Sequence, residues 1–135
     1  MILLEIYIIL FITTMLHESA HAVVAILCKL KVSAVTIFFT TSKYAFEFVH
    51  KNFTLSIGWI PLGGFIQVID WEMVARNKKI AILSAGIMTN FLTGIASIII
   101  SGEGFFYHFG IISIIVGLMN CIPFQGSDLY KILKL

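Results

Sequence analysis

Long apolar runs dominate the sequence. Residues 2–28 form the first run, which holds no glycine or proline, and residues 80–101 and 105–124 form two more. About 20 consecutive apolar residues are enough for a helix to cross the hydrocarbon core of a bilayer. The pattern therefore predicts three spanning helices over these ranges, the third interrupted near its end by Asn120 and Pro123.

Residues 32–60 follow a different pattern, in which apolar and polar side chains alternate. The alternation is clearest over residues 53–59 and weaker over residues 35–39 and 46–48. A period of two is typical of β-strands. Because an open sheet cannot face lipid, we expect these strands to lie in water, at the membrane interface or against protein.

The segment between the strands and the second run begins with Pro-Leu-Gly-Gly at residues 61–64, which predicts a turn. Residues 65–79 follow as an interfacial stretch, since Trp71 and its charged neighbours suit headgroup depth. The predicted fold is an all-α membrane protein. Its three-helix transmembrane core carries a small β-hairpin or sheet at the cytoplasmic face after the first helix. Residues 1–135 show no internal repeat or linker and are expected to form a single domain.

Composition and charge support a membrane location. Hydrophobic residues make up 59% of the chain and charged residues 12%, against about 45–50% and 25% in soluble domains. If all three runs span, every lysine and arginine falls on one side. The positive-inside rule then places the N-terminus outside, and the C-terminus and the second end of the first run in the cytoplasm. The basic residues form no dense stripe, which argues against nucleic-acid binding.

The main candidate for chemistry is His-Glu-Ser-Ala-His at residues 17–21, inside the first apolar run. Positions i and i+4 share one face of a helix, so His17 and His21 can present two imidazoles to one metal ion. Glu18 then lies where it can act as general base. Ionisable residues inside a span are rare and cost about 2.5–3.5 kcal/mol each. The alternative is a polar cluster that only contacts other helices.

A catalytic zinc site usually takes three protein ligands, so a third must come from elsewhere in the chain. The acidic candidates are Asp70, Glu72, Glu103 and Asp128. With a rise of about 1.5 Å per residue, His17 lies in the inner third of the membrane. Asp128 follows a span that runs from outside to inside, so it reaches a similar depth and is the best candidate.

Two asparagines also lie in the predicted spans. Asn90 reaches the middle of the membrane, and Asn120 precedes Asp128 on the interrupted segment. A buried asparagine must find hydrogen-bond partners. The functional interpretation gives one or both a role in binding the substrate backbone or the oxyanion of a tetrahedral intermediate. The alternative is a structural hydrogen bond between helices.

These residues together resemble the site-2 protease family of intramembrane zinc metalloproteases. Residues 17–21 match its zinc motif, and residues 85–91 resemble the Gly-x-x-x-Asn motif of its middle core helix. Residues 61–65 resemble a turn common before that helix in bacterial members. Asn-Cys-Ile-Pro at residues 120–123, followed by Asp128, resembles its second motif, usually Asn-x-x-Pro and then Leu-Asp-Gly.

The resemblance implies a Zn²⁺ ion held by His17, His21 and Asp128, with Glu18 as the base. It also implies hydrolysis of a peptide bond in or near the transmembrane segment of a membrane-protein substrate, in a bacterial cell membrane. The strands within residues 32–60 would engage the unwound substrate. A partner or regulatory membrane protein is a further expectation.

The sequence also departs from the family pattern. Leu129 stands where a glycine usually follows the aspartate, Ile87 replaces a frequent proline, and no PDZ domain fits in residues 102–108. The chain is therefore expected to be a minimal core. These departures motivate a second hypothesis, a catalytically inactive relative that acts as a membrane scaffold or regulator. A metal-transport component is a third, disfavoured because the ligands form one cluster on one side.

Overall fold

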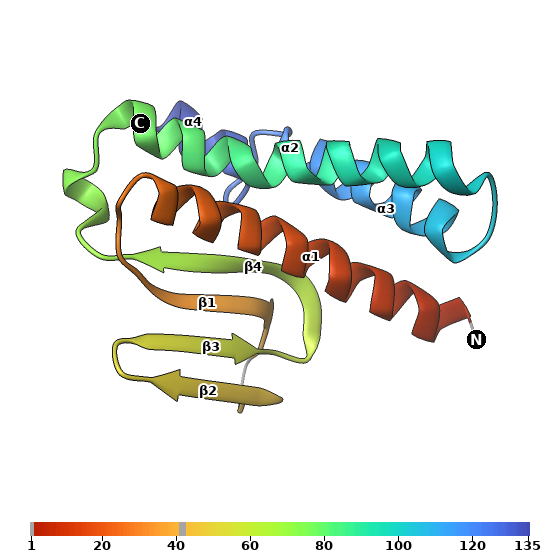
Figure 1. Ribbon diagram of the computed structural model, residues 1–135, viewed down its shortest axis with the longest axis horizontal. Coiled ribbons are helices and arrows are strands. Elements are labelled where there is room, and N and C mark those ends of the chain that lie inside the picture. The colour runs from red at the N-terminus through yellow and green to blue at the C-terminus, as the bar shows by residue number, and fades with distance from the viewer. Residues whose placement is uncertain (1, 41–42) are drawn as a thin grey trace.

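The computed structural model describes residues 2–40 and 43–135, and these form a helical layer and a β-sheet (Figure 1). The helices are α1 (Ile2–Leu27), α2 (Arg76–Ser101), α3 (Phe105–Asn120), the short α4 (Asp128–Leu133) and the 3-10 helix η1 (Trp71–Met73). The strands are β1 (Val32–Phe39), β2 (Phe46–His50), β3 (Phe53–Ile57) and β4 (Ile60–Val68).

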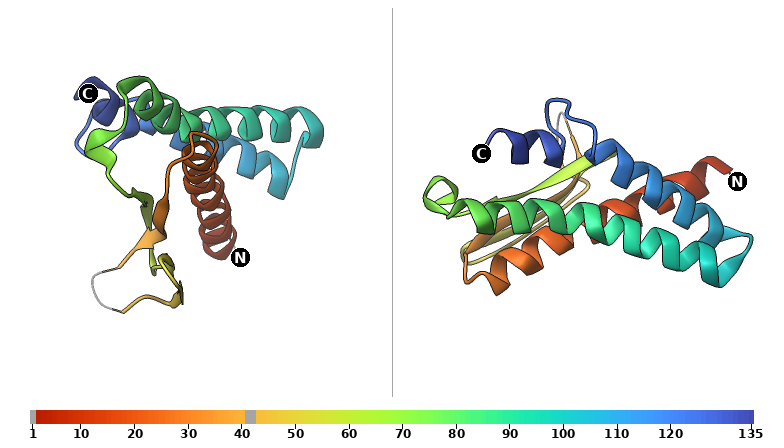
Figure 2. Two further views of the ribbon diagram at one scale, coloured as in Figure 1. Left: turned by 60° about the vertical axis from the view of Figure 1, so that its left-hand side comes forward. Right: turned by 90° about the horizontal axis from the view of Figure 1, so that it is seen from above.

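Among the described residues, two helices are long and apolar enough to cross a membrane, at Leu3–Leu27 and Arg76–Ser101. They run in opposite directions, and α3 returns beside α2 (Figures 1 and 2). The predicted third span, residues 105–124, is longer than the helix that forms there. Helix α3 ends at Asn120 after 16 residues, which is about 24 Å of helix. Pro123 cannot donate the backbone hydrogen bond that a continuing helix needs, and an irregular segment follows.

The strands form a mixed four-stranded sheet in the order β2-β3-β1-β4, so the described chain is mostly helical and not all-α. Strands β2 and β3 form the expected hairpin. Strand β1 pairs parallel with β3 and antiparallel with β4. The sheet lies along one side of α1, away from α2 and α3 (Figure 2). This leaves β4 at one edge of the sheet.

The turn predicted at residues 61–64 is wrong, because these residues belong to β4. Within this stretch Gly64 lies opposite Ile37 of β1, and Ile60 just before it lies opposite Phe39, with an irregularity between the two pairs where Gly63 has a φ of +62°. The pairing of β4 with β1 outweighs the local preference of glycine and proline for a turn. A proline is tolerated on an edge strand. The predicted interfacial stretch, residues 65–79, likewise begins inside β4, continues through η1 and ends in the first turn of α2.

A bulge in β1 attaches the sheet to α1. The register shifts between Ile37 and Phe39, and Phe38 has a φ of +63°. Ile37 and Phe38 therefore both enter one buried cluster, although alternation would place them on opposite faces. The Phe38 ring is fully buried and packs edge-to-face on Tyr7 and Phe11 of α1, with ring centroids 5.5 and 5.6 Å away.

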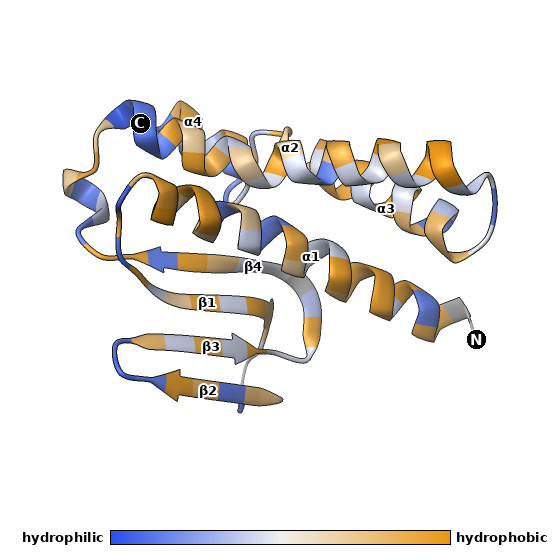
Figure 3. Ribbon diagram, viewed as in Figure 1, coloured by the Kyte–Doolittle hydropathy of each residue, from blue (hydrophilic) through white to orange (hydrophobic). Residues whose placement is uncertain are grey.

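Hydropathy differs between the helices and their ends. Apolar residues cover most of α1, α2 and α3, and hydrophilic residues gather where α2 begins, beside the C-terminus, and in the loop between α2 and α3 (Figure 3). The last turn of α1, the first turn of α2 and α4 lie at one end of the molecule, and the N-terminus lies at the other (Figure 1).

Candidate metal centre

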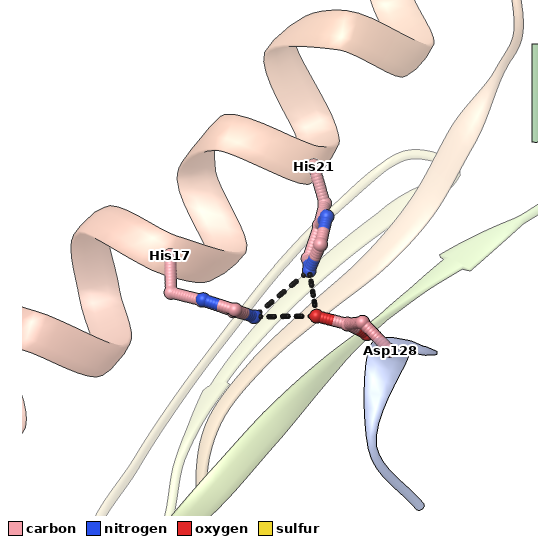
Figure 4. A group of neighbouring side chains, drawn as sticks. All are labelled: His17, His21 and Asp128. Carbon is pink, nitrogen blue, oxygen red and sulfur yellow. Dashed lines mark hydrogen bonds and ion pairs between the residues drawn. The ribbon is translucent and has the colours of Figure 1, made fainter. Parts of the chain in front are cut away.

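Two imidazoles of α1 converge on one point. His17 and His21 are one helical turn apart, and 6% and 4% of their surfaces are exposed. Their Nε2 atoms are 3.0 Å apart and the rings are perpendicular, so both nitrogens aim at the same space (Figure 4). The i, i+4 spacing therefore brings the two imidazoles together, as the sequence motif predicts.

Asp128 completes the group from the other end of the chain. Its Oδ2 atom lies 2.9 Å from His17 Nε2 and 3.2 Å from His21 Nε2, and the residue is 2% exposed. It begins α4, whose first turn is capped by the Ser127 hydroxyl, which accepts a hydrogen bond from the Tyr130 amide. The cap fixes the backbone from which the carboxylate reaches α1.

The geometry of the three atoms fits a tetrahedral metal ion. Zinc binds imidazole nitrogen and carboxylate oxygen at about 2.0–2.2 Å, so the ligand atoms of a tetrahedral site lie roughly 3.3–3.5 Å apart. The observed separations of 2.9, 3.0 and 3.2 Å are slightly shorter. A small outward adjustment would admit the ion, and His17, His21 and Asp128 are a buried group that could hold a metal.

The charge on Asp128 suits this role. Burial would by itself raise the pKa of its carboxyl group, but hydrogen bonds with His17 and His21 hold that pKa well below its ordinary value. The Nζ atom of Lys131 lies 3.2 Å from the second carboxylate oxygen and adds a favourable charge. These contacts favour the carboxylate, the form of aspartate that binds metal ions.

Helix α2 contacts the two imidazoles from behind. His21 Nδ1 donates a 2.6 Å hydrogen bond to the Ile82 carbonyl oxygen, and His17 Nδ1 lies 3.0 Å from the Asn90 amide nitrogen. Gly86 lies between these contacts, four residues from each, on the same helix face. A methyl group there would approach within 2.6 Å of atoms in both imidazoles, so only glycine leaves room for them.

Glu18 lies next to the metal group and borders the strand β4. The residue is 5% exposed, and a methyl group on Gly64 of β4 would come within 2.8 Å of its Cγ atom. Glu18, His21 and Asp128 line one cavity of about 580 Å³. The rest of its wall comes from β4, η1, α2 and the C-terminal residues. The candidate site therefore borders this cavity.

The other candidates lie elsewhere. The Asn120 amide donates to the Val116 carbonyl of its own helix, 3.1 Å away, and Asn120 does not line the cavity. Its predicted role at the oxyanion stays a prediction. Glu72 lines the cavity without joining the metal group, and Asp70 and Glu103 do neither. Sequence reasoning missed the contacts of Gly86 and Ile82 with the histidines, although the spacing of Ile82, Gly86 and Asn90 marks one helix face.

Comparison with known families agrees with this geometry. Residues 5–104 match the model of peptidase family M50. The chain belongs to peptidase family M50, the site-2 protease family. No curated protein matches the chain. The matched region holds His17, His21 and Asn90. Asp128 lies beyond it, but its side chain contacts His17 within the matched region. The M50 assignment and the two long apolar helices together indicate a membrane protein.

Proposed function

We propose that this chain is an intramembrane zinc metalloprotease that hydrolyses a peptide bond in or near the transmembrane segment of a membrane protein. The observation that carries the proposal is the buried group of His17, His21 and Asp128 in an M50 chain, with Glu18 beside it. A scaffold would need the fold, but it would have no use for a buried carboxylate next to three converging ligands, which is costly to keep at membrane depth.

The ligand set assigns a role to each side chain. His17, His21 and Asp128 would hold the ion, and a bound Zn²⁺ supplies Lewis-acid polarisation of the scissile carbonyl and of a water molecule. Glu18 would accept the proton of the attacking water and pass it to the leaving amine. The buried surroundings strengthen these electrostatic interactions, because little bulk water competes with them.

The edge strand β4 supports an extended substrate. Strand β4 pairs with β1 on one side and lines the cavity with Phe65 to Val68. A substrate helix must unwind before its peptide bonds become accessible, and an unwound segment can add to a sheet edge through main-chain hydrogen bonds. The role that the resemblance suggested for residues 32–60 therefore falls to β4, which begins at Ile60.

The distribution of charge supports an orientation in the membrane. Lys29, Lys31 and Lys78 line a second cavity, near the end of α1 and the start of α2. Glu103 lies at the far end of α2, in the turn to α3. Under the positive-inside rule the metal end faces the cytoplasm and the N-terminus lies outside. The resemblance to bacterial members of the family supports a bacterial cell membrane as the location.

The deciding experiment compares metal content with cleavage. Wild type, Glu18→Gln and Asp128→Ala are purified in detergent, zinc per chain is measured, and each protein is incubated with a panel of single-span substrates. We expect about one zinc ion per chain in wild type and Glu18→Gln, because glutamine keeps the volume of the base and the three ligands are intact. Asp128→Ala should hold much less, and only wild type should cleave.

Two other outcomes would contradict the proposal. Cleavage by Glu18→Gln at the wild-type rate would remove Glu18 from the mechanism. Zinc in wild type without cleavage of any substrate would favour the inactive scaffold or regulator. Thr13→Val is a matched control. Thr13 lies on α1, like Glu18, and the substitution removes a buried hydrogen bond of 3.2 Å to Ser113 of α3. It should keep both zinc and cleavage.

A further inference from the structure

The two amide atoms of Asn90 have different surroundings. The side chain is fully buried, and its Nδ2 atom lies 3.0 Å from His17 Nδ1. Its Oδ1 atom has no hydrogen-bond partner among the described residues. A buried amide oxygen without a partner is uncommon, because its desolvation is not repaid.

Metal binding restricts the protonation of the imidazoles. A neutral imidazole carries its proton on one nitrogen and a lone pair on the other. The atoms that face Asp128 are the Nε2 atoms of His17 and His21, so metal binding requires the proton of each ring on Nδ1. His21 satisfies this requirement, since its Nδ1 donates to the Ile82 carbonyl.

His17 needs a hydrogen-bond acceptor at its Nδ1 atom. The Asn90 amide nitrogen, which now faces this atom, is a donor, and it favours the tautomer with the proton on Nε2. That proton would occupy the lone pair that a metal requires. A half-turn of the Asn90 amide exchanges the two atoms and brings the partnerless oxygen to His17 Nδ1. Either orientation leaves one amide atom without a partner, so the state of His17 decides between them.

We propose that Asn90 is a positioning residue for the metal, whose amide oxygen accepts the Nδ1 proton of His17 and thereby prepares Nε2 as a ligand. This inference rests on the proposed metal site but not on any cleavage activity. Helix α2 then holds both imidazoles in the metal-binding tautomer, His21 through the Ile82 backbone and His17 through the Asn90 side chain. Asn90 is therefore assigned to the ligand and not to the oxyanion of the substrate.

Two substitutions separate this role from simple packing. Asn90→Leu keeps the approximate volume and removes the acceptor. Asn90→Asp keeps an acceptor oxygen at the same place, in the carboxylate–histidine–metal arrangement common in metalloproteins. Thr13→Val is the matched control, because Thr13 is also fully buried and its hydroxyl bonds to Ser113 of α3, away from the imidazoles.

The first readout is zinc affinity, measured in detergent by competition with a chromophoric chelator. Loss of a partner to a metal-binding histidine typically weakens metal affinity 10- to 100-fold. We expect such a loss for Asn90→Leu, affinity within a few-fold of wild type for Asn90→Asp, and no change for Thr13→Val. An Asn90→Leu affinity equal to that of wild type would overturn the inference. So would an Asn90→Asp protein as weak as Asn90→Leu.

The second readout is the histidine tautomer, observed in the wild-type side chains and in the conservative variant Asn90→Asp, so it does not depend on Asn90→Leu folding. The chain has four histidines, so His50→Gln and His108→Gln leave only His17 and His21 for ¹⁵N-histidine NMR of the zinc-loaded protein. Both rings should carry Nδ1 protons, and only the His17 Nδ1 proton should shift in Asn90→Asp. A His17 signal that does not respond would overturn the inference. Failure of wild type to cleave would contradict the protease alone, because neither readout involves a substrate.

Discussion

At the scale of single residues, the candidate site depends on a few atoms whose positions leave little freedom. Three ligand atoms lie 2.9–3.2 Å apart, and the imidazoles that carry two of them are confined from behind by α2. The closest approach is at Gly86, where the helix backbone lies against both rings. Small changes at this position should therefore have large effects on metal binding.

We predict that Gly86→Ala weakens zinc binding at least tenfold. The added methyl group would lie 2.6 Å from His17 Cε1, His17 Nε2 and His21 Cε1, so both rings must leave the positions in which their Nε2 atoms converge with Asp128. Alanine should otherwise favour the helix, by up to about 1 kcal/mol. Zinc affinity in detergent, measured beside helix content by circular dichroism, tests the expectation.

Gly94→Ala is the matched control for this prediction. Gly94 also lies on α2, and its added methyl group would meet Ile114 Cγ1 at 2.7 Å and the Gly110 carbonyl oxygen at 2.9 Å on α3. It should lower stability by disturbing the packing of the two helices without changing zinc affinity in the folded fraction. Equal zinc affinities in the two variants would show that Gly86 has no special contact with the ligands.

At the scale of secondary-structure elements, the sheet is held to the helical layer through both β1 and β4, and β1 contributes a bulge at this contact. The bulge at Phe38 turns one more apolar side chain toward α1 than alternation allows. The positive φ of Phe38 is unfavourable for a bulky residue, so the surrounding packing must stabilise it. Because β4 pairs with β1, the same attachment positions Gly64 of β4 against Glu18.

We predict that Phe38→Ala destabilises the protein by about 3–5 kcal/mol, because it leaves a cavity where the ring met Tyr7 and Phe11. The neighbouring Phe39→Ala should cost far less, since Phe39 is 54% exposed. Thermal unfolding in the same detergent compares the two variants. A similar shift of the midpoint in both would mean that the bulge does not anchor the sheet.

At the scale of the whole molecule, the arrangement of the helices brings distant segments to one end. His17 and Asp128 are 111 positions apart, yet their side chains are in contact. The chain achieves this by running along α1, back along α2 and returning through α3, so α4 packs on α2 and Asp128 reaches His17 and His21 of α1 (Figure 1). The turn between α2 and α3 lies at the opposite end, with the N-terminus.

We predict that the two ends face opposite sides of the membrane. In a background with Cys28→Ser and Cys121→Ser, a cysteine replaces Glu103 in the α2–α3 turn or Asn52 in the β2–β3 turn. A membrane-impermeant thiol reagent should label the Glu103→Cys protein in intact cells. It should label the Asn52→Cys protein only after permeabilisation. The reverse pattern would contradict the orientation drawn from the positive-inside rule.

The sequence by itself determined the elements whose signals are local. The long apolar runs identified α1 and α2 within a few residues, since hydrophobic length alone decides whether a helix can span. The i, i+4 spacing identified His17 and His21 as a pair, because helix geometry fixes their relative position. Depth arithmetic selected Asp128, which the structure brings to both histidines.

Only the tertiary structure decided the features that depend on contacts between distant segments. The Pro-Leu-Gly-Gly stretch belongs to β4 because β4 pairs with β1, and the local sequence does not reveal this pairing. Gly86 and Asn90 acquired their relation to the imidazoles when α2 packed on α1, and the sequence left Asn90 between two other roles. Local patterns fix periodicity and depth, whereas the packing of helices against each other fixes which face of α2 meets the metal ligands.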